Sequence, residues 1–198
     1  MAQLVAGTPT DFTTRIAELI WSEDPALIGL EYQSYENWVD AAQKEWPVAG
    51  AANSYDSTTL AMDGDAIVGL INGFPASEIE PRFDKSSEVQ GARLVSDDIA
   101  DAIDTLFAEP IENAFYILDI AVHVSAQNTG LGGRLMEHAD QLARRAGCTS
   151  LYLDTYASNA AVGFYQHLGF VINQRTHSAV LDAFGVDPYL QLVRPISQ

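Results

Sequence analysis

The stretch that decides the fold is FYILDIAVHVSAQNTGLGGRLMEHADQLARR, residues 115–145 of a chain of 198 residues. Residues 115–124 are almost all apolar, which predicts a central strand that is buried on both faces of a sheet. A glycine-rich turn follows, and apolar residues then recur at helical spacing from Leu131 to Ala146, with Gly147 where a helix-ending glycine is expected. Glycines before the first turn of a helix leave its free N–H groups open to an anionic ligand such as phosphate. The stretch therefore predicts a strand, a phosphate-binding turn and a helix.

Strand-like and helix-like segments alternate on both sides of this stretch. The dipeptide Asp-Gly at 63–64 lies between two apolar runs and predicts a hairpin, whereas Asp-Pro at 24–25 is expected to end the first helix. A polar, acidic segment at about 75–113 is expected to be an excursion from the sheet. Together these features predict a single domain over residues 1–198 with an α/β or α+β fold and a mixed sheet. The expected strands are 4–6, 57–62, 66–74, 115–124, 150–156, one that begins at Phe170, and 189–193 ended by Pro195; the expected helices are one that starts at Thr10-Asp11, 35–46, 96–107, 131–146 and 159–168.

Composition excludes several classes of protein. Apolar residues make up 47% of the chain, enough for a core, and no apolar run approaches the length of a membrane span. The net charge of −17 repels nucleic acid and anionic membranes, so neither is expected as a partner. No secretory leader is recognised at the start, and the single cysteine, Cys148, forms no internal disulfide, so a reducing cytoplasm is expected. The histidines show no metal-ligand spacing, and no metal is expected.

The acidic charge is concentrated in the first part of the chain. Residues 1–112 hold 5 Lys and Arg against 21 Asp and Glu, whereas residues 113–198 hold 5 against 6. Such an asymmetry suits a protein that binds an anionic ligand with its C-terminal half and attracts a cationic one with its N-terminal half. It equally suits an acidic surface that only keeps the protein soluble, and charge counts do not separate the two interpretations.

Two known phosphate-binding loops do not fit the turn. A Walker loop needs Lys-Ser or Lys-Thr after a glycine, and the only lysines are Lys44 and Lys85. A dinucleotide-binding loop needs a third glycine where this chain has Leu135, and it needs a tighter turn than residues 124–130. The pattern that fits is Gln-x-x-Gly-x-Gly at 127–132, following a strand.

This pattern, together with the strand LDIAV at 118–122, resembles the GCN5-related N-acetyltransferase (GNAT) family. The strand LYLDT at 151–155 and the segment 159–170, with the pattern N-x-A-x-x-F-Y-x-x-L-G-F, are similar to the family's fifth strand and the helix after it. The close resemblance covers residues 115–175 and leaves out the acidic excursion. It implies a mostly antiparallel sheet with helices on both faces and a splay between strands 4 and 5.

The resemblance also implies that acetyl coenzyme A (acetyl-CoA) is the acyl donor. Its pyrophosphate is then expected on the amides of 127–133, with the charge of Arg134 beside them, and its pantetheine arm along 121–124 like an added strand. The backbone N–H of Val122 is expected to polarise the thioester carbonyl, while the side chain packs in the core. Asn159 is expected to cap its helix and to hydrogen-bond the arm. The residues expected to contact the cofactor are Ala121, Val122, Val124, Gln127, Asn128, Thr129, Gly130, Leu131, Gly132, Gly133, Arg134, Asn159 and Phe164.

Acyl transfer to an amine also needs a proton donor for the departing thiolate. Tyr165 is the candidate acid, because a phenol is protonated at neutral pH and can donate. The core stripe of its short helix is expected to come from Ala161, Phe164 and Leu168, which turns the tyrosine away from the buried face. A half-buried packing tyrosine is the alternative.

A proton acceptor for the amine is needed as well. Asp119, a carboxylate inside the central strand, is the candidate base and resembles an acidic position that some family members use near the acceptor. Asp154 in the partner strand, or a chain of waters, is the alternative.

Two functions of different class remain at this point. The first is an N-acetyltransferase that moves an acetyl group from acetyl-CoA to a primary amine of a small-molecule or protein acceptor, which the acidic half predicts to be cationic. The second is a non-catalytic module that senses acyl-CoA or docks a partner. A homodimer is compatible with either.

Overall fold

The computed structural model describes residues 2–91 and 94–196, and its centre is a seven-stranded sheet in the order β1-β2-β3-β4-β5-β7-β6. Every neighbouring pair is antiparallel except β4–β5, which is parallel. The mixed, mostly antiparallel sheet is therefore confirmed. The strands are β1 (Gln3–Ala6), β2 (Thr58–Asp63), β3 (Ala66–Pro75), β4 (Ala114–Val122), β5 (Ser150–Tyr156), β6 (Val171–Thr176) and β7 (Tyr189–Pro195).

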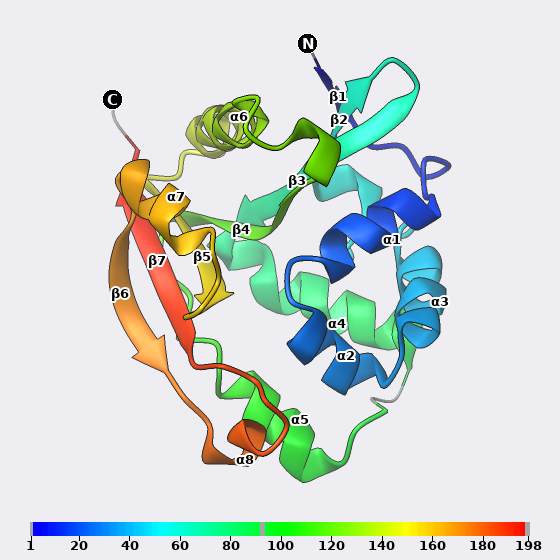
Figure 1. Cartoon of the computed structure of the whole chain (residues 1–198), viewed down its shortest axis with the longest axis vertical. Coiled ribbons are helices and arrows are strands. Elements are labelled where there is room, and N and C mark those ends of the chain that lie inside the picture. Colours follow the sequence, from blue (N-terminus) through cyan, green and yellow to red (C-terminus); the bar gives the residue numbers. More distant parts are fainter. Residues whose placement is uncertain (1, 92–93, 197–198) are drawn as a thin grey trace.

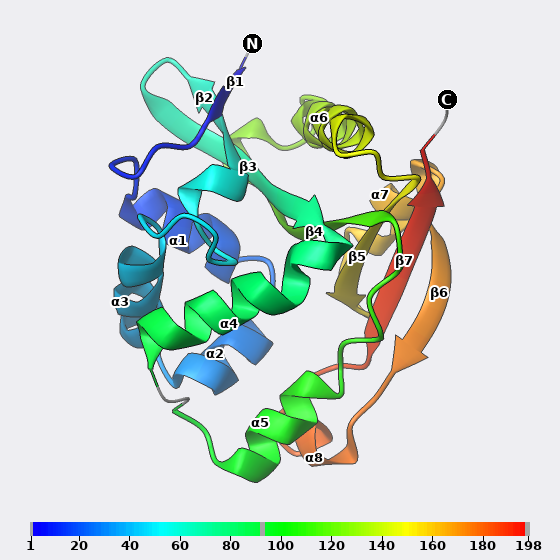
Figure 2. The ribbon, with the colours of Figure 1, turned by 180° about the vertical axis from the view of Figure 1, so that it is seen from behind.

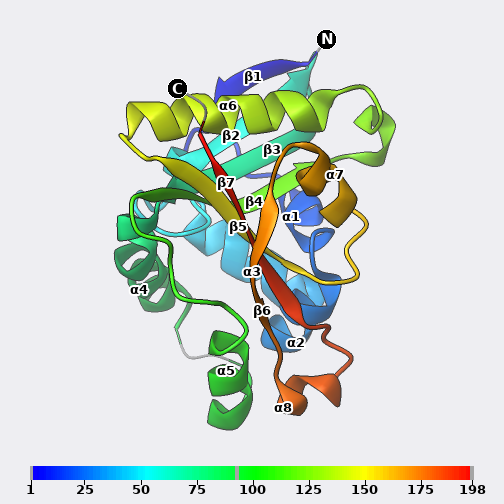
Figure 3. The same ribbon diagram turned by 90° about the vertical axis from the view of Figure 1, so that its left-hand side faces the viewer.

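Helices cover both faces of this sheet, as Figures 1 and 3 show. α6 and α7 pack on one face, and α1, α3 and the start of α4 pack on the other. α2, α5 and α8 pack together beyond the end of the sheet at which β7 begins. Figure 2 shows α4 on the second face, next to α3. The helices are α1 (Thr14–Trp21), α2 (Pro25–Tyr32), α3 (Tyr35–Glu45), α4 (Ile79–Gln90), α5 (Asp97–Asp104), α6 (Leu131–Arg145), α7 (Val162–His167) and α8 (Ala179–Asp182), with 3-10 turns η1 (Tyr55–Ser57), η2 (Ala76–Glu78) and η3 (Val124–Ala126).

The apolar stripe predicted for residues 131–146 forms the largest core. α6 lays this stripe on β3, β4 and β5, and the chain leaves the helix at Gly147, whose φ of 75° suits a glycine. Burying each large side chain contributes about 1.5–3 kcal/mol, which fixes the helix on the sheet. The buried residues of the stripe are Leu131, Leu135, Met136, Ala139 and Ala143.

β4 and β5 are paired over three residues only and then separate. The pairs are Ala114–Ser150, Phe115–Leu151 and Tyr116–Tyr152. β4 continues to Val122 and β5 to Tyr156, and no further pairing joins them within the described residues. The predicted splay is confirmed, and it leaves backbone groups of β4 facing a gap in the sheet.

One extra residue interrupts the pairing of β4 with β3. Asp119 pairs with Asn72 and Ile117 with Gly73, so Leu118 has no partner on β3. A bulge of this kind increases the local twist and shifts the alternation of side chains by one residue. As a result Leu118 and Asp119 both line the cavity described below, whereas Ile117 packs on the side of α6.

Several predicted helix boundaries are wrong. α1 begins at Thr14 and not at Thr10. The dipeptide at 24–25 begins α2 instead of only ending the first helix, because Asp24 Oδ1 accepts the Leu27 N–H at 2.9 Å and proline occupies the first turn.

The sequence-based prediction also missed some elements and misplaced the ends of others. α4 lies within the segment 75–113 and carries no apolar stripe, since its only buried residue is Ser86. α8 is a single short turn of four residues. α7 begins at Val162 rather than at Asn159, and Pro195 is the last residue of β7 instead of lying outside the strand.

Within residues 2–91 and 94–196 no helix combines the length and the apolar character that crossing a membrane requires.

Candidate active site

The turn before α6 exposes the free end of the helix. Gly130, with a φ of 82°, precedes α6, and the N–H of Arg134 makes the first intrahelical bond, to the Gly130 carbonyl at 3.2 Å. The N–H groups of residues 131–133 therefore have no carbonyl one turn earlier in the helix to bond. A Cβ at Gly133 would meet no atom within 4 Å, so the backbone is open to a ligand there. These features fit the pyrophosphate of acetyl-CoA, which helix N-termini favour.

Polar side chains of the turn hold its shape. Gln127 Nε2 donates to the Val122 carbonyl at 3.1 Å, and Thr129 Oγ1 donates to the Ala126 carbonyl at 2.6 Å. Asn128 takes a left-handed backbone conformation with a φ of 60°. The turn is thus tied back to the end of β4 by its own residues.

The other residues expected around the phosphates lie in different surroundings. Arg134 Nη2 donates to the Ala2 carbonyl at 2.8 Å, so its guanidinium is engaged beside β1. Leu131 is buried in the core, which leaves its backbone to meet a ligand, and Val124 is 73% exposed at the start of η3.

Two amides of β4 point into the gap. The N–H of His123 donates to the Val68 carbonyl of β3 at 2.9 Å. Because N–H groups alternate between the two edges of a strand, the amides of Val122 and Ile120 point away from β3 and into the split. The Ile120 N–H is bonded by Glu23 Oε2 at 3.0 Å. An extended thioester arm added along 121–124 would meet the Val122 N–H.

Tyr165 of α7 is buried against the α6 side of the split. It is 6% exposed, and its ring packs edge-on against Phe170 with centroids 6.0 Å apart. The expected orientation of the helix is wrong: Tyr165 belongs to the buried core, while the residues expected to form the stripe, Ala161, Phe164 and Leu168, are only partly buried. Burial, and then the charge of Glu23, raise the pKa of Tyr165, so its hydroxyl remains a proton donor at neutral pH.

The neighbours of Tyr165 shape the same end of the split. Phe164 packs on the first turn of α6, where a Cβ at Gly132 would come within 3.2 Å of its ring. Asn159 does not occupy the residue directly before α7; its Oδ1 accepts the N–H of Ala161 at 2.8 Å and its Nδ2 donates to Thr155 at 2.9 Å. Asn159 therefore fixes the connection between β5 and α7.

A cavity of about 690 Å³ opens on the opposite face, between α2, α3, α4, α5 and the split. Its floor includes Tyr116, Leu118 and Asp119 of β4 with Tyr152 and Asp154 of β5. The walls carry four more carboxylates and several aromatic rings, and Lys44 is the only cationic side chain among the described residues that line it. The wall carboxylates are Glu31, Asp40, Asp104 and Glu109, and the wall rings are Tyr32, Trp38, Phe83 and Phe107.

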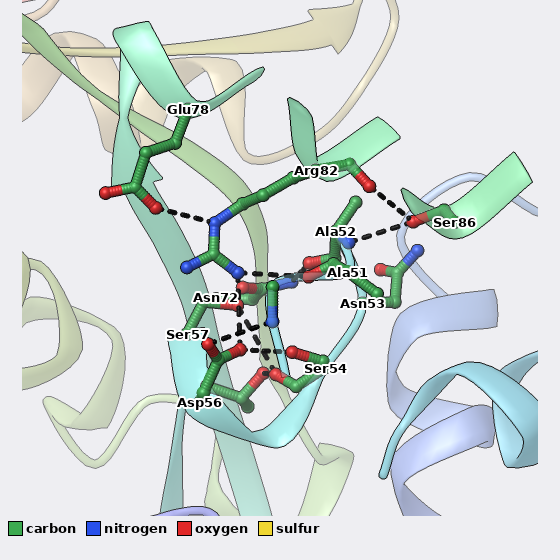
Figure 4. A network of polar contacts seen from close by, with 12 residues as sticks. Ala51, Ala52, Asn53, Ser54, Asp56, Ser57, Asn72, Glu78, Arg82 and Ser86 are labelled. Atoms are coloured by element: carbon green, nitrogen blue, oxygen red, sulfur yellow. Dashed lines mark hydrogen bonds and ion pairs between the residues drawn. The ribbon is translucent and has the colours of Figure 1, made fainter. Parts of the chain in front are cut away.

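Asp119 is held from β3 by a buried amide. Asn72 Nδ2 donates to Asp119 Oδ2 and to the Ala52 carbonyl, at 2.9 Å in each case. The loop that carries Ala52 is in turn bonded to α4, since Ser86 Oγ accepts the Ala52 N–H at 2.9 Å (Figure 4). The position of Asp119 thus depends on a chain of contacts that reaches α4.

α4 is braced against the same loop by an ion-pair network, which Figure 4 shows. Arg82 donates to Glu78 at 2.8 Å, to the Ala51 carbonyl at 3.0 Å and to Asp56 at 3.2 Å. Glu45, fully buried beneath, accepts a hydrogen bond from Gln90 at 2.6 Å. The start of the acidic segment is therefore joined to the loop that supports the cavity.

The two carboxylates of the cavity floor are both hard to ionise. Burial raises the pKa of Asp119 to about 7, against the hydrogen bond from Asn72, which lowers it. Burial likewise raises the pKa of Asp154 to about 7, against the hydrogen bond from Tyr116. Asp154 Oδ1 is buried and has no hydrogen-bond partner within the described part of the chain. Carboxylates with such pKa values can exchange protons near neutral pH.

The model of the Acetyltransferase (GNAT) family matches residues 14–170, most of the chain. The chain belongs to this family. It is an acyltransferase, and GNAT enzymes use acetyl-CoA. Among the residues that the structure describes, no group of three or more His, Cys, Asp and Glu is arranged to hold a metal ion.

Solved structures of acetyltransferases share this GNAT fold along the whole chain. An acetyltransferase of unstated source is 20% identical, with a TM-score of 0.68 over 98% of this chain and 100% of its own. An N-acetyltransferase from Staphylococcus aureus is 18% identical, with a TM-score of 0.70 over 98% and 100%. An acetyltransferase from Bacillus subtilis, solved in complex with CoA, is 16% identical with a TM-score of 0.59 over 100% of both chains. Comparison with curated protein sequences gives no match.

The sequence analysis missed one residue of the candidate site entirely. Glu23, between α1 and α2, reaches the Ile120 amide from a loop with no motif around it. Its pKa is raised well above the ordinary value, first by burial and next by Asp119. The only available signal was a carboxylate beside Asp24-Pro25, which indicates a helix start rather than a catalytic site.

Proposed function

We propose that this protein transfers the acetyl group of acetyl-CoA to a primary amine of a small cationic molecule by direct attack on the thioester. The observation that supports this most is the split between β4 and β5, which joins the glycine turn on one face to the acidic cavity on the other. A donor held along β4 and an acceptor held in the cavity then meet in the gap.

The cavity favours a cationic acceptor of small-molecule size. Its volume of about 690 Å³ lies within the range of sites for drug-sized ligands. Among the described residues that line the cavity, carboxylates outnumber the one lysine, which favours a positively charged ligand. The faces of the aromatic rings in its walls attract cations and also pack against apolar parts of a ligand. Polyamines and aminoglycosides have this chemistry.

The donor site uses mostly backbone. The amides of 131–133 bind the pyrophosphate and the edge of 121–124 binds the arm, while Gln127, Asn128 and Thr129 keep the turn in shape. The Val122 N–H donates a hydrogen bond that stabilises the negative charge developing on the thioester oxygen, a contribution of a few kcal/mol in comparable sites. Phe164 and Asn159 shape the wall beside it.

Proton transfer involves one group on each side of the sheet. Tyr165, on the α6 side, protonates the departing thiolate. Asp119, on the cavity side, receives the proton that the ammonium loses, with Asp154 as the alternative acceptor. The compartment we propose is a reducing cytoplasm, which suits the single cysteine.

Two measurements test the proposal. Calorimetry with CoA and acetyl-CoA asks whether the donor binds, and release of free thiol from acetyl-CoA is followed with putrescine, spermidine, kanamycin and lysine amide. Thiol release that depends on at least one amine supports the transferase. Binding of acetyl-CoA without release for any amine favours the sensor, and a folded protein that binds no CoA contradicts both.

A further inference from the structure

Glu23 lies where the two substrates of the proposed function would meet. The turn before α6 follows the end of β4, and the cavity floor lies at Tyr116 and Asp119, earlier in the same strand. A donor arm along 121–124, with its thioester oxygen at the Val122 N–H, therefore directs its acetyl end toward Ile120. Glu23 Oε2 already accepts the Ile120 N–H there at 3.0 Å.

The second oxygen of this carboxylate has no partner in the part of the chain that the structure describes. Glu23 Oε1 is buried and makes no hydrogen bond to any of residues 2–91 and 94–196. Burying a carboxylate oxygen without a donor is costly, and native proteins rarely leave one so. An unmet acceptor at the meeting point indicates a donor that arrives with the substrate, and an amine is such a donor.

The loop that carries Glu23 is fixed from both sides of the split. The Tyr189 hydroxyl of β7 donates to Asp24 Oδ2, while Asp24 Oδ1 accepts the Leu27 N–H at 2.9 Å. Two neighbouring carboxylates thus bind opposite halves of the sheet, Glu23 to β4 and Asp24 to β7. Glu23 is held in the gap and does not move with a free loop.

We propose that Glu23 Oε1 binds the acceptor amine and takes the proton that the amine loses as it attacks the thioester. The inference rests on the proposed function. The ammonium gives one proton to Glu23, and the neutral nitrogen then bonds to the acetyl carbon as the bond from that carbon to sulfur breaks. Tyr165 protonates the thiolate and is reprotonated, through solvent, by the second proton of the amine. The products are the amide, the free thiol and one proton.

Asp119 then acts one step further out. Its Oδ2 is bonded by Asn72 and the residue faces the cavity, so it passes the proton of Glu23 to solvent. The titratable groups that face Glu23 are Asp119 from β4, Asp24 in its own loop and Tyr165 from α7. Burial and the two neighbouring carboxylates raise the pKa of Glu23, which brings its basicity closer to that of an amine.

The experiment compares Glu23→Gln and Glu23→Asp with the wild type and with Glu18→Gln. Glutamine keeps an oxygen for the Ile120 N–H, and Glu18 is an exposed residue of α1 paired with Arg15, which makes it a matched control. Thiol release is measured from about pH 6 to 9.5 with saturating acetyl-CoA and the four amines named above. Melting temperatures and the acetyl-CoA dissociation constant are recorded for each variant.

We expect Glu23→Gln to lose about 100-fold or more in kcat/KM for the amine, the range of a missing general base. Its rate should still rise about tenfold per pH unit through this range, because only the amine that is already neutral reacts and its pKa is near 10.4. The wild type should level off earlier, Glu23→Asp should recover part of the activity, and Glu18→Gln should match the wild type.

Each of the other outcomes contradicts either the inference about Glu23 or the proposed function. Wild-type activity and pH profile in Glu23→Gln contradict the inference and leave the proposed function standing. Equal losses in both Glu23 variants, together with loss of acetyl-CoA binding or folding, show that Glu23 is only a structural brace. Absence of amine-dependent thiol release from the wild type contradicts the proposed function, and the inference falls with it.

Discussion

Replacing Asp119 by Asn should stabilise the free protein, and the gain should grow with pH. Asp119 is 7% exposed and burial raises its pKa to about 7, whereas an aspartate in an unfolded chain titrates near ~3.9. Below pH ~3.9 Asp119 is protonated in both the folded and the unfolded state, so its raised pKa does not lower the stability of the protein. As the pH rises to about 7 the unfolded state gains a favourable ionisation that the folded state resists, so stability is lost.

The size of the effect follows from the difference of ~3 pKa units. At ~1.4 kcal/mol per unit, the folded protein loses up to about 4 kcal/mol above pH 7 and about 2 kcal/mol near pH 5.5. Asparagine removes this loss and keeps an oxygen to accept the hydrogen bond from Asn72. The free energy of unfolding of Asp119→Asn minus that of the wild type should therefore increase by about 2 kcal/mol between pH 5.5 and pH 8.5.

Urea denaturation at these two pH values measures the difference without approaching the pI of about 4.3. Asp65→Asn, in the exposed β2–β3 turn, is the control and should change stability by less than ~0.5 kcal/mol at either pH. If the gain from Asp119→Asn is the same at both pH values, Asp119 is not a carboxyl group with a raised pKa, and its assignment as a proton carrier near neutral pH fails.

Two further substitutions test the acid and the bulge. Tyr165→Phe removes only the hydroxyl and should lower kcat about 100-fold at saturating acetyl-CoA with little change in acetyl-CoA affinity; wild-type turnover in a thiol-release assay would show that this hydroxyl is not the acid. Gly73→Ala should destabilise the protein by about 2–4 kcal/mol, because its Cβ would lie 2.6 Å from the Tyr116 carbonyl oxygen. Gly163→Ala, whose Cβ would meet no atom within 4 Å in α7, should instead stabilise by about 0.5–1 kcal/mol, and equal thermal denaturation of the two variants would refute the packing argument.

The sequence predicted the parts of the site that depend on local pattern. The strand expected at 115–124, the glycine turn and the apolar stripe of α6 each follow from residues close together in the chain. The structure contains all three, but the strand ends at Val122, two residues earlier than expected. The orientation of Tyr165 was wrong because α7 has only six residues, too few for spacing to define its buried face.

The parts of the site and of the fold that depend on contacts between distant residues could not be predicted from the sequence. Nothing near Glu23 in the sequence indicates that it bonds an amide 97 residues later. α4 was missed because it is held by polar contacts of Arg82 and Ser86, which leave no apolar period to detect. The extra residue in β4 was equally hidden, since strict alternation from Phe115 and Ile117 would put Asp119 in the apolar core.

Because the alternation resets at Leu118, the bulge adds one extra side chain to the cavity without changing the pairing on either side of it. Deleting that single position would close the bulge: Asp119 would follow Ile117 directly, still opposite Asn72 and facing the cavity, and only the Leu118 side chain would be lost. Replacing Leu118 leaves the register intact and alters only one patch of the cavity floor. Under the proposed function, variation at Leu118 therefore changes which amines are accepted while Asp119 keeps its position.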